Sequence, residues 1–468
     1  MALEKTTFET IVPSRFISLS FPNPNPNHSS SFFRIAVLDS AGLTDDPPRV
    51  AAMFVPEHRE SDWIFCTEPG HLQLLFNSPG ISRLILVGNQ PENVHPSSAI
   101  YRRLAKNDMS CELEVSLKPL LLALSPKTCF KYGIPEIPIL SYEDNVICSL
   151  VLGSFVGSMV GEMLVEDVEI EVENEGGRCL NREFRRRLRF KRMPNLIQTE
   201  VRIFPKKGIG LTSVEIGEVE FSPDNGVLVH PYLAPMVAGL NLIGKHIEEQ
   251  IRSGFRPKAL CLGVGGGALL AFLRTQLGFK VLGVEEDEQV LSVARQFFGL
   301  EDCQLLKIFV GDAMKFIEKI AHPTRGWNAS SFGRHEVEND IKMDDVDAEF
   351  DVIMVDLDSC DARSGVSAPP LEFRQKHVLM AAKSILSKNG ILVLNVIPQS
   401  SAFYETTKHE FQEVFSELYE IDVGNGENFV LMAAPSPITS SSTDSEIAFL
   451  SKLRNVISGV FMDSIRKI

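Results

Sequence analysis

The sequence lacks any run of about 18 uncharged apolar residues, which a membrane-spanning helix would need. It also lacks a surplus of basic residues, because 46 Lys and Arg stand against 61 Asp and Glu and the net charge is −15. Nucleic acids and anionic membranes attract proteins through surplus positive charge. We therefore expect neither direct nucleic-acid binding nor membrane binding.

The eight cysteines form no Cys-x-x-Cys pair and no cluster with histidine at zinc-site spacing. We expect no metal site, and we interpret the cysteines as reduced thiols of a cytosolic-type compartment. The N-terminus also lacks an apolar signal core, and Glu4 and Glu9 precede the first arginine, Arg15, which fits a transit peptide poorly. These features predict a cytoplasmic protein.

Composition and length indicate a folded chain of more than one domain. Hydrophobic residues make up 44% of the 468 residues and charged residues 23%, which is typical of a globular protein. A chain of this length exceeds what one hydrophobic core usually serves. Residues 1–194 predict a mixed, sheet-containing accessory domain without a catalytic motif, and residues 195–468 predict the domain that carries the chemistry.

The accessory region contains a reversal of charge. Residues 166–175 are mainly acidic, and residues 178–192 are rich in arginine. We interpret the two stretches as a solvated face whose halves attract each other. The alternative is a docking patch for an acidic partner.

From residue 258 onward, strand and helix signals alternate, which is the pattern of a parallel sheet with crossover helices. The last two strands are joined by residues 424–427, which are too few for a crossover, so that pair is expected to be antiparallel. Residues 322–349 predict a flexible surface insertion, and residues 446–468 a final amphipathic helix. The expected strands are residues 258–262, 280–284, 305–310, 351–355, 390–396, 419–423 and 428–433.

The first of these strands runs into a glycine-rich turn that contains Gly263, Gly265 and Gly267. Glycine allows a sharp turn and close approach of a ligand, and free N–H groups at a helix start favour negative charge. The second strand ends in Glu285, about 20 residues further on, where a carboxylate can accept hydrogen bonds from ribose hydroxyls. A tight strand-to-helix turn without a ligand gives a similar glycine cluster. A nicotinamide dinucleotide and S-adenosylmethionine fit this pattern equally well, because both contain an adenosine ribose.

Polar residues also end the later strands, where open α/β sheets bind ligands. Asp312 and Ala313 follow the third strand, at a position that commonly meets the adenine amino group in methyltransferases. Asp356 ends the fourth strand, and we assign it to both the cofactor and the acceptor side. Asp358 and Asn395 complete the predicted acceptor side, since acidic groups favour a sulfonium and orient an amine. The alternatives are a helix-cap or turn carboxylate for Asp358 and a strand cap for Asn395.

These segments resemble the spermidine-synthase-like branch of class I methyltransferases. Within that branch they are similar to the C-terminal half of the eukaryotic elongation factor 1-alpha lysine and N-terminal methyltransferase, the methyltransferase-like protein 13 family. The likeness spans most of residues 50 to 435, and the family's separate N-terminal lysine methyltransferase domain has no counterpart here. Many class I methyltransferases carry an acidic residue two positions before the first glycine of the turn, whereas this sequence has Cys261 at that position. The similar segments include 262–267, 284–287, 294–299, 350–359 and 391–395.

The resemblance implies an α/β, Rossmann-like fold with a seven-stranded, mostly parallel sheet and an antiparallel last strand. It implies the cofactor S-adenosyl-L-methionine and a protein amine as the acceptor, namely the N-terminal α-amine of elongation factor 1-alpha. One alternative is a spermidine-type aminopropyltransferase, which resembles residues 229–232 and 358–361 but typically has an acidic residue at the position of Ala268 and proline at that of Ala362. Another is a non-catalytic scaffold that retains the fold. The sequence predicts no oligomeric state.

Overall fold

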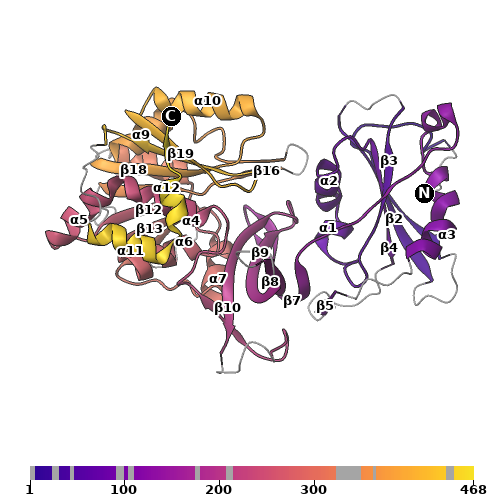
Figure 1. The fold of residues 1–468 in the computed structure, drawn as a ribbon, viewed down its shortest axis with the longest axis horizontal. Helices are drawn as coiled ribbons and strands as arrows, with labels where there is room; N and C mark the ends of the chain where they lie inside the picture. Colours follow the sequence, from indigo (N-terminus) through magenta and orange to yellow (C-terminus); the bar gives the residue numbers. More distant parts are fainter. Residues whose placement is uncertain are drawn as a thin grey trace.

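A computed structural model describes residues 6–23, 31–42, 47–90, 100–103, 110–173, 180–206, 214–322, 349–361, 365–438 and 447–468. Nearly all of the expected insertion at 322–349 lies outside these residues. The described chain forms sheets of five, six, eight and two strands. In Figure 1 the six-stranded sheet lies between the five-stranded sheet and the eight-stranded sheet. No helix among the described residues combines the length and apolar character needed to cross a bilayer.

The five-stranded sheet has the order β1-β2-β4-β3-β6 and helices on both faces (Figure 1). Helix α3 packs against one face through Leu117 and Leu121. Helices α1 and α2 pack against the other through Phe65 and Leu74. Strands β3, β4 and β6 are parallel, and the others are antiparallel. The elements are β1 (Phe16–Pro22), β2 (Phe32–Asp39), β3 (Val50–Phe54), α1 (Trp63–Cys66), α2 (Glu68–Phe76), β4 (Arg83–Asn89), α3 (Ser110–Ala123) and β6 (Ile139–Leu140).

The six-stranded sheet is antiparallel throughout, in the order β11-β10-β9-β8-β7-β5. The division of the chain at residue 194 stays a prediction, and it falls in the turn between β9 and β10 of this sheet. The strands are β5 (Ile100–Arg102), β7 (Val146–Gly157), β8 (Gly161–Glu173), β9 (Leu180–Phe190), β10 (Ile197–Pro205) and β11 (Phe221–Asp224).

The acidic and basic stretches are neighbouring strands, β8 and β9, of this sheet. Asp167 accepts a hydrogen bond of 2.7 Å from Nε of Arg186, and Glu166 lies 2.8 Å from Nε of Arg189. The two halves therefore attract each other, as expected. The expectation of a solvated face is wrong for these groups, because Asp167 is only 3% exposed and Arg186 7%. Arg186 also donates to the backbone oxygen of Phe297, which lies in the eight-stranded unit, so that unit covers the pair.

The eight-stranded sheet has the order β14-β13-β12-β15-β18-β20-β19-β21. The first five strands are parallel, and β20 is antiparallel to both of its neighbours. The seven expected strands and the antiparallel last strand are confirmed. The eighth strand, β21, lies where we expected a helix. The strands are β12 (Lys258–Leu262), β13 (Lys280–Glu285), β14 (Leu306–Val310), β15 (Phe350–Val355), β18 (Leu386–Val396), β19 (Glu417–Asp422), β20 (Phe429–Ala434) and β21 (Arg466–Lys467).

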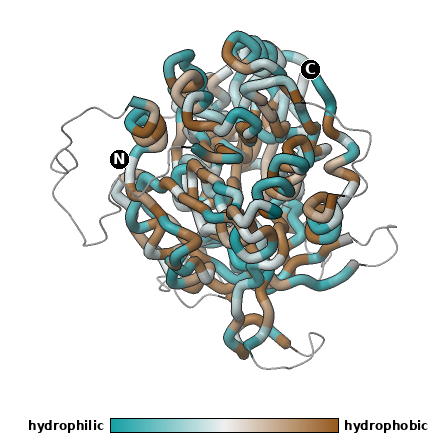
Figure 2. Tube along the Cα trace, turned by 90° about the vertical axis from the view of Figure 1, so that its left-hand side faces the viewer, coloured by the Kyte–Doolittle hydropathy of each residue, from teal (hydrophilic) through white to brown (hydrophobic). Residues whose placement is uncertain are grey.

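Helices cover both faces of this sheet, because its strands alternate between two apolar cores. Leu260 and Ile353 face the core built with α8, α9 and α10, whereas Cys261 and Met354 face the core built with α4, α5, α6, α7, α11 and α12. Figure 2 shows hydrophobic and hydrophilic residues side by side along the helices, as amphipathic helices require. The helices are α4 (Leu233–Ala238), α5 (Gly244–Arg252), α6 (Ala268–Phe272), α7 (Glu288–Phe297), α8 (Ala313–Ala321), α9 (Lys376–Ser384), α10 (Ser401–Gln412), α11 (Ala448–Val456) and α12 (Gly459–Asp463).

Candidate active site

The glycine-rich turn joins β12 to α6, and its glycines are required by both conformation and space. Gly263, Gly265 and Gly267 have φ angles of 84°, 52° and 82°, in the left-handed region that favours glycine. A Cβ on Gly263 would lie 2.2 Å from the backbone oxygen of Asp356. A Cβ on Gly267 would lie 2.6 Å from Cδ1 of Leu300. The turn is therefore packed against the end of β15 on one side and the segment after α7 on the other.

The backbone N–H groups of this turn all have acceptors within the protein. Val264 and Gly265 donate to Oε2 of Glu285 at 3.1 and 3.2 Å. Gly266 donates to Oγ1 of Thr199 at 2.8 Å. Gly263 and Gly267 donate to backbone oxygens. Two side chains from other elements thus accept three N–H groups of the turn, whereas the expectation of free N–H groups concerns the start of α6 and stays a prediction.

Glu285 ends β13 beside this turn. Its Oε1 accepts a hydrogen bond of 3.2 Å from the N–H of Asp287. Burial raises the pKa of Glu285, although three backbone N–H groups favour its ionised form. Asp287 caps α7 and accepts from the N–H groups of Met159 and Val160 at 2.7 and 3.1 Å. The tip of the β7–β8 hairpin is thus fastened next to Glu285.

Asp312 and Ala313 lie at the same edge of the sheet, because Gly311 donates its N–H to the backbone oxygen of Glu285 at 2.8 Å. Asp312 is the N-cap of α8, and its Oδ1 accepts from the N–H of Lys315 at 3.0 Å. Ala313 is the first residue of that helix and is buried. The two residues are therefore placed beside Glu285, with the Asp312 side chain also serving the helix.

Asp356 follows β15, and its N–H donates to the backbone oxygen of Leu262 at 2.9 Å. Its carboxylate accepts from the hydroxyl of Tyr232 at 3.0 Å and from Nδ2 of Asn395 at 3.4 Å. Asn395 in turn accepts from Nδ2 of Asn428 at 2.8 Å. Burial raises the pKa of Asp356 to about 6, and the nearby Asp358 adds to the rise. Asp356 and Asn395 are brought together as predicted, and Asn395 bonds to side chains within the site instead of capping β18.

Asp358 lies nearer to solvent. Its Oδ1 is 3.7 Å from an Nη2 atom of Arg192, and the two side chains are 24% and 38% exposed. The residues after Asp358 form the short strand β16 (Ser359–Asp361), which pairs with β17 (Gly365–Ser367). The helix-cap alternative for Asp358 is therefore wrong. Asp358 and Arg192 thus form a partly exposed charged pair beside Asp356.

Sequence reasoning missed several residues here, because they precede the turn by 30 residues or more. Thr199 and Tyr232 contact the turn and Asp356 directly. Among the described residues, buried nitrogen atoms without a hydrogen-bond partner include Nε2 of Gln198, Nδ1 of His230 and Nε of Arg192. Burial lowers the pKa of His230, whose Nε2 lies 3.0 Å from a backbone oxygen. The segment 229–232 gave the one available signal, through its likeness to aminopropyltransferases.

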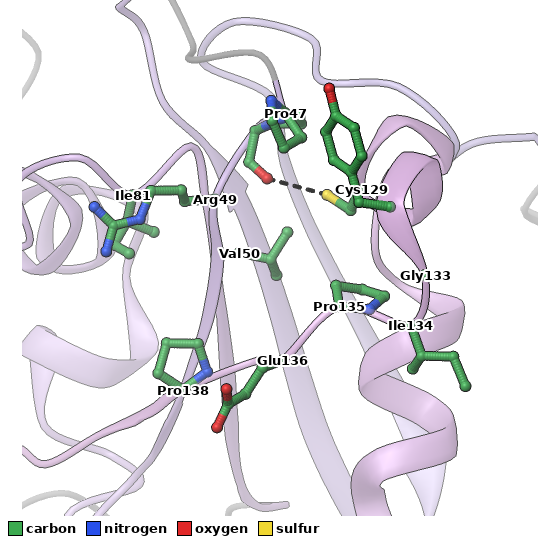
Figure 3. Close-up of a pocket in the computed structure, with 12 residues that line it drawn as sticks. Pro47, Arg49, Val50, Ile81, Cys129, Gly133, Ile134, Pro135, Glu136 and Pro138 are labelled. Atoms are coloured by element: carbon green, nitrogen blue, oxygen red, sulfur yellow. Dashed lines mark hydrogen bonds between the residues drawn. The ribbon is translucent and has the colours of Figure 1, made fainter.

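A cavity of about 410 Å³ lies elsewhere, at the start of β3 in the five-stranded sheet (Figure 3). Pro47, Val50 and Pro138 line it, and Cys129 donates from its sulfur to the backbone oxygen of Pro48 at 3.1 Å. None of the predicted site residues lines this cavity. The candidate site is therefore defined by the carboxyl ends of the parallel strands and not by this cavity.

The fold is that of the class I methyltransferases. Counted along the chain, the seven main strands of the eight-stranded sheet lie in the order 3-2-1-4-5-7-6, with the seventh antiparallel. A glycine turn after the first strand and acidic residues after the second and fourth meet at one edge. This strand order alone carries the assignment.

The chain is similar to curated proteins named eEF1A lysine and N-terminal methyltransferase. The protein of Danio rerio is 28% identical over 418 residues, which are 84% of this chain and 53% of that protein. The human protein is 24% identical over 433 residues, which are 86% of this chain and 54% of that protein. The chain thus spans about half the length of the curated relatives it matches.

No protein-family model matches the chain. Among solved structures, human methyltransferase-like protein 13 in complex with SAH shows a TM-score of 0.39 and 25% identity, covering 48% of this chain and 92% of that one. A probable spermidine synthase from Corynebacterium glutamicum also shows a TM-score of 0.39, with 15% identity over 65% of this chain and 86% of that one.

Proposed function

We propose that this chain is an S-adenosylmethionine-dependent methyltransferase that acts on a protein amine. The observation that carries the proposal is the meeting of the glycine turn, Glu285 and the Asp356 cluster at the carboxyl ends of β12, β13 and β15. Open α/β sheets bind ligands at this edge. S-adenosylmethionine supplies an electrophilic methyl group on a sulfonium, and the residues around it bind and orient the reactants.

The donor set fits this cofactor. We assign Gly263, Gly265 and Gly267, whose turn has no room for a Cβ, to the cofactor side, and Glu285 lies where ribose hydroxyls would donate to it. We assign Asp312 and Ala313 to the adenine side. Beside the turn, the unpartnered Nε2 of Gln198 is a donor and Nδ1 of His230 is an acceptor. In the amino-acid end of the cofactor, the carboxylate accepts hydrogen bonds and the amino group donates them.

Asp356, Asn395 and Asp358 form the proposed acceptor side. The pKa of about 6 leaves Asp356 mostly ionised at pH 7, so its carboxylate can orient an amine and accept its proton. Asn395 donates to one oxygen of this carboxylate, and Asp358 is nearer to solvent. At pH 7 an α-amine is neutral in roughly a tenth of molecules and a lysine in well under a thousandth. An N-terminal amine therefore needs less help from the site.

We infer that the acceptor is the N-terminal α-amine of elongation factor 1-alpha. The names of the relatives support this acceptor, and they also contain a lysine activity that we do not assign to this chain. In the test, labelled S-adenosylmethionine is incubated with elongation factor 1-alpha whose N-terminus is free or acetylated. We expect label only in the free protein. Equal labelling of both would exclude the N-terminal assignment. Formation of spermidine from putrescine and decarboxylated S-adenosylmethionine would instead assign the chain as an aminopropyltransferase.

We also propose that the protein acts in the cytoplasm, where its partner is the proposed substrate. The five described cysteines that are free thiols, among them the buried Cys148 and Cys261, support a reducing compartment. Imaging of a fluorescent fusion tests this location, and accumulation in an organelle would contradict it.

A further inference from the structure

We propose that Thr199, a residue of the six-stranded sheet, is a positioning residue of the cofactor site. Its hydroxyl fixes the backbone of Gly266 and holds the glycine turn in its binding conformation. This inference rests on the proposed function, because it concerns the turn that would hold S-adenosylmethionine. It makes the six-stranded sheet a part of the cofactor site.

The contact is short and buried. The N–H of Gly266 donates to Oγ1 of Thr199 at 2.8 Å, and Thr199 is 6% exposed. A Cβ on Gly266 would lie 2.5 Å from Cγ2 of Thr199, and a Cβ on Gly265 would lie 2.8 Å from Oγ1. The methyl group and the hydroxyl of one side chain therefore both face the turn. Because the N–H of Gly266 is buried, removal of the Thr199 hydroxyl leaves this N–H without an acceptor, which is unfavourable. We expect the turn to move in response.

Thr199 is itself held firmly. Glu200, the next residue of β10, lies 2.7 Å from Nε of Arg187 and 2.6 Å from Nη1 of Arg185 on the neighbouring strand. The sheet is also fastened to the eight-stranded unit by the bonds from Met159 and Arg186 to Asp287 and Phe297. The hydroxyl thus reaches Gly266 from a rigid support.

The turn needs such a support. Three of its glycines have positive φ angles, and glycine loses more conformational freedom on ordering than any other residue. Glu285, which holds two other N–H groups of the turn, is the proposed ribose ligand. Thr199 is a side-chain anchor of the turn to which we assign no ligand. An anchor that orders a binding loop beforehand lowers the entropic cost of binding.

Two substitutions separate the hydroxyl from the shape of the side chain. Thr199→Val keeps the shape and removes the acceptor, and Thr199→Ser keeps the acceptor and removes the methyl group. Binding of S-adenosylmethionine to the purified full chain is measured by calorimetry. We expect Thr199→Val to bind roughly tenfold more weakly, and Thr199→Ser to bind as the wild type does within about twofold. In methyl transfer, Thr199→Val should raise KM for the cofactor and leave kcat at saturation unchanged.

The matched control is Thr407→Val. Thr407 is also buried, and its hydroxyl donates to the backbone oxygen of Phe403 within α10, a helix on the other face of the eight-stranded sheet. This variant controls for the loss of a buried threonine hydroxyl and should bind the cofactor normally. Unchanged affinity in Thr199→Val, or equal weakening in Thr199→Val and Thr407→Val, would overturn the role of Thr199. Absence of binding in the wild-type chain would instead reject the proposed function, and with it this inference.

Discussion

Two half-buried aspartates show how different a carboxylate's surroundings are beside the six-stranded sheet and at the edge of the eight-stranded sheet. Asp62, the N-cap of α1, lies 3.1 Å from Nη1 of Arg189 in β9 and 2.7 Å from Nη2 of Arg59. Burial alone would raise its pKa, but the two guanidinium groups lower it to about 2. Among the residues that the structure describes, the side-chain donors to Asp356 are the neutral groups of Tyr232 and Asn395, and burial raises its pKa to about 6.

The difference separates structural from chemical use of an acid. A carboxylate that is paired with cations stays ionised at any ordinary pH, so it can hold a fold together but cannot exchange a proton near neutrality. A buried carboxylate with neutral partners has a pKa near the working pH, which suits proton transfer. On this reasoning the pairs of Asp62 with Arg189 and Arg59 are framework, and we expect Asp356 to be the reactive group.

The largest expected effect comes from Asp356→Asn. This change keeps the shape and the hydrogen bond from Tyr232 but removes the proton acceptor. We expect kcat to fall about 10²- to 10⁴-fold, with cofactor affinity changed much less. Radiolabel transfer to elongation factor 1-alpha measures the rate.

The control for that variant is Asp351→Asn, at the opposite end of the same strand. Asp351 is buried, and it accepts from the N–H of Lys258 at 2.8 Å and lies 2.7 Å from Nε2 of His246. The Asp351→Asn variant should retain the wild-type rate of methyl transfer when it is assayed well below its unfolding temperature. A rate in Asp356→Asn close to that of Asp351→Asn would show that Asp356 is not the reactive acid.

The second effect is on stability, through Arg189→Ala. This change leaves the buried Glu166 without its cation and leaves Asp62 with Arg59 alone, and we expect the free energy of unfolding to fall by about 3–5 kcal/mol. Lys191→Ala, on the same stretch, breaks a pair with Glu162 whose side chains are 37% and 47% exposed, and should cost at most about 1 kcal/mol. Chemical denaturation measures both. Equal losses would contradict the division between buried framework and surface pairs.

The eight-stranded sheet was readable from the sequence because helices bury it on both faces. Strands such as β15 are apolar at nearly every position. The pattern therefore predicts that these strands exist and that they are buried on both faces. The six-stranded sheet was not readable in this way. Its strands β8 and β9 carry charges at buried positions such as Asp167 and Arg186, and a run of charges predicts a solvated surface unless the pairing across strands is known. The eighth strand, β21, has two residues and no period to detect.

The residues of the candidate site also fall into two groups, those that the sequence could place and those that it could not. Gly263, Glu285 and Asp356 follow apolar strands directly, so their place at the carboxyl edge follows from the fold class. Thr199 comes from β10 and Tyr232 from the segment before α4, and only the tertiary structure brings them to the turn and to Asp356. No spacing rule connects residues that reach a site from another sheet.

A third prediction tests whether Glu285 belongs with Asp356 as a ligand-facing acid. Glu285→Gln keeps an acceptor for the turn but removes the charge that ribose hydroxyls favour, so we expect S-adenosylmethionine to bind up to about 100-fold more weakly. The exposed neighbour Glu286→Gln is the control and should bind normally. Calorimetry measures both affinities. Unchanged binding in Glu285→Gln would remove it from the site and leave it as a support of the turn.

The smallest effect is the pH dependence that separates the two aspartates. The pKa of Asp356 rises from 3.8 to about 6 on folding, so between these values the folded chain binds more protons, and stability falls as pH rises through this window. Asp62 has a lowered pKa, so its contribution is present above pH 3.8 and is lost as pH falls toward about 2. Asp356→Asn should therefore unfold like the wild type near pH 4 and be about 2 kcal/mol more stable at pH 7. Denaturation across this range measures the difference, and a gap that does not change with pH would mean that Asp356 does not titrate there.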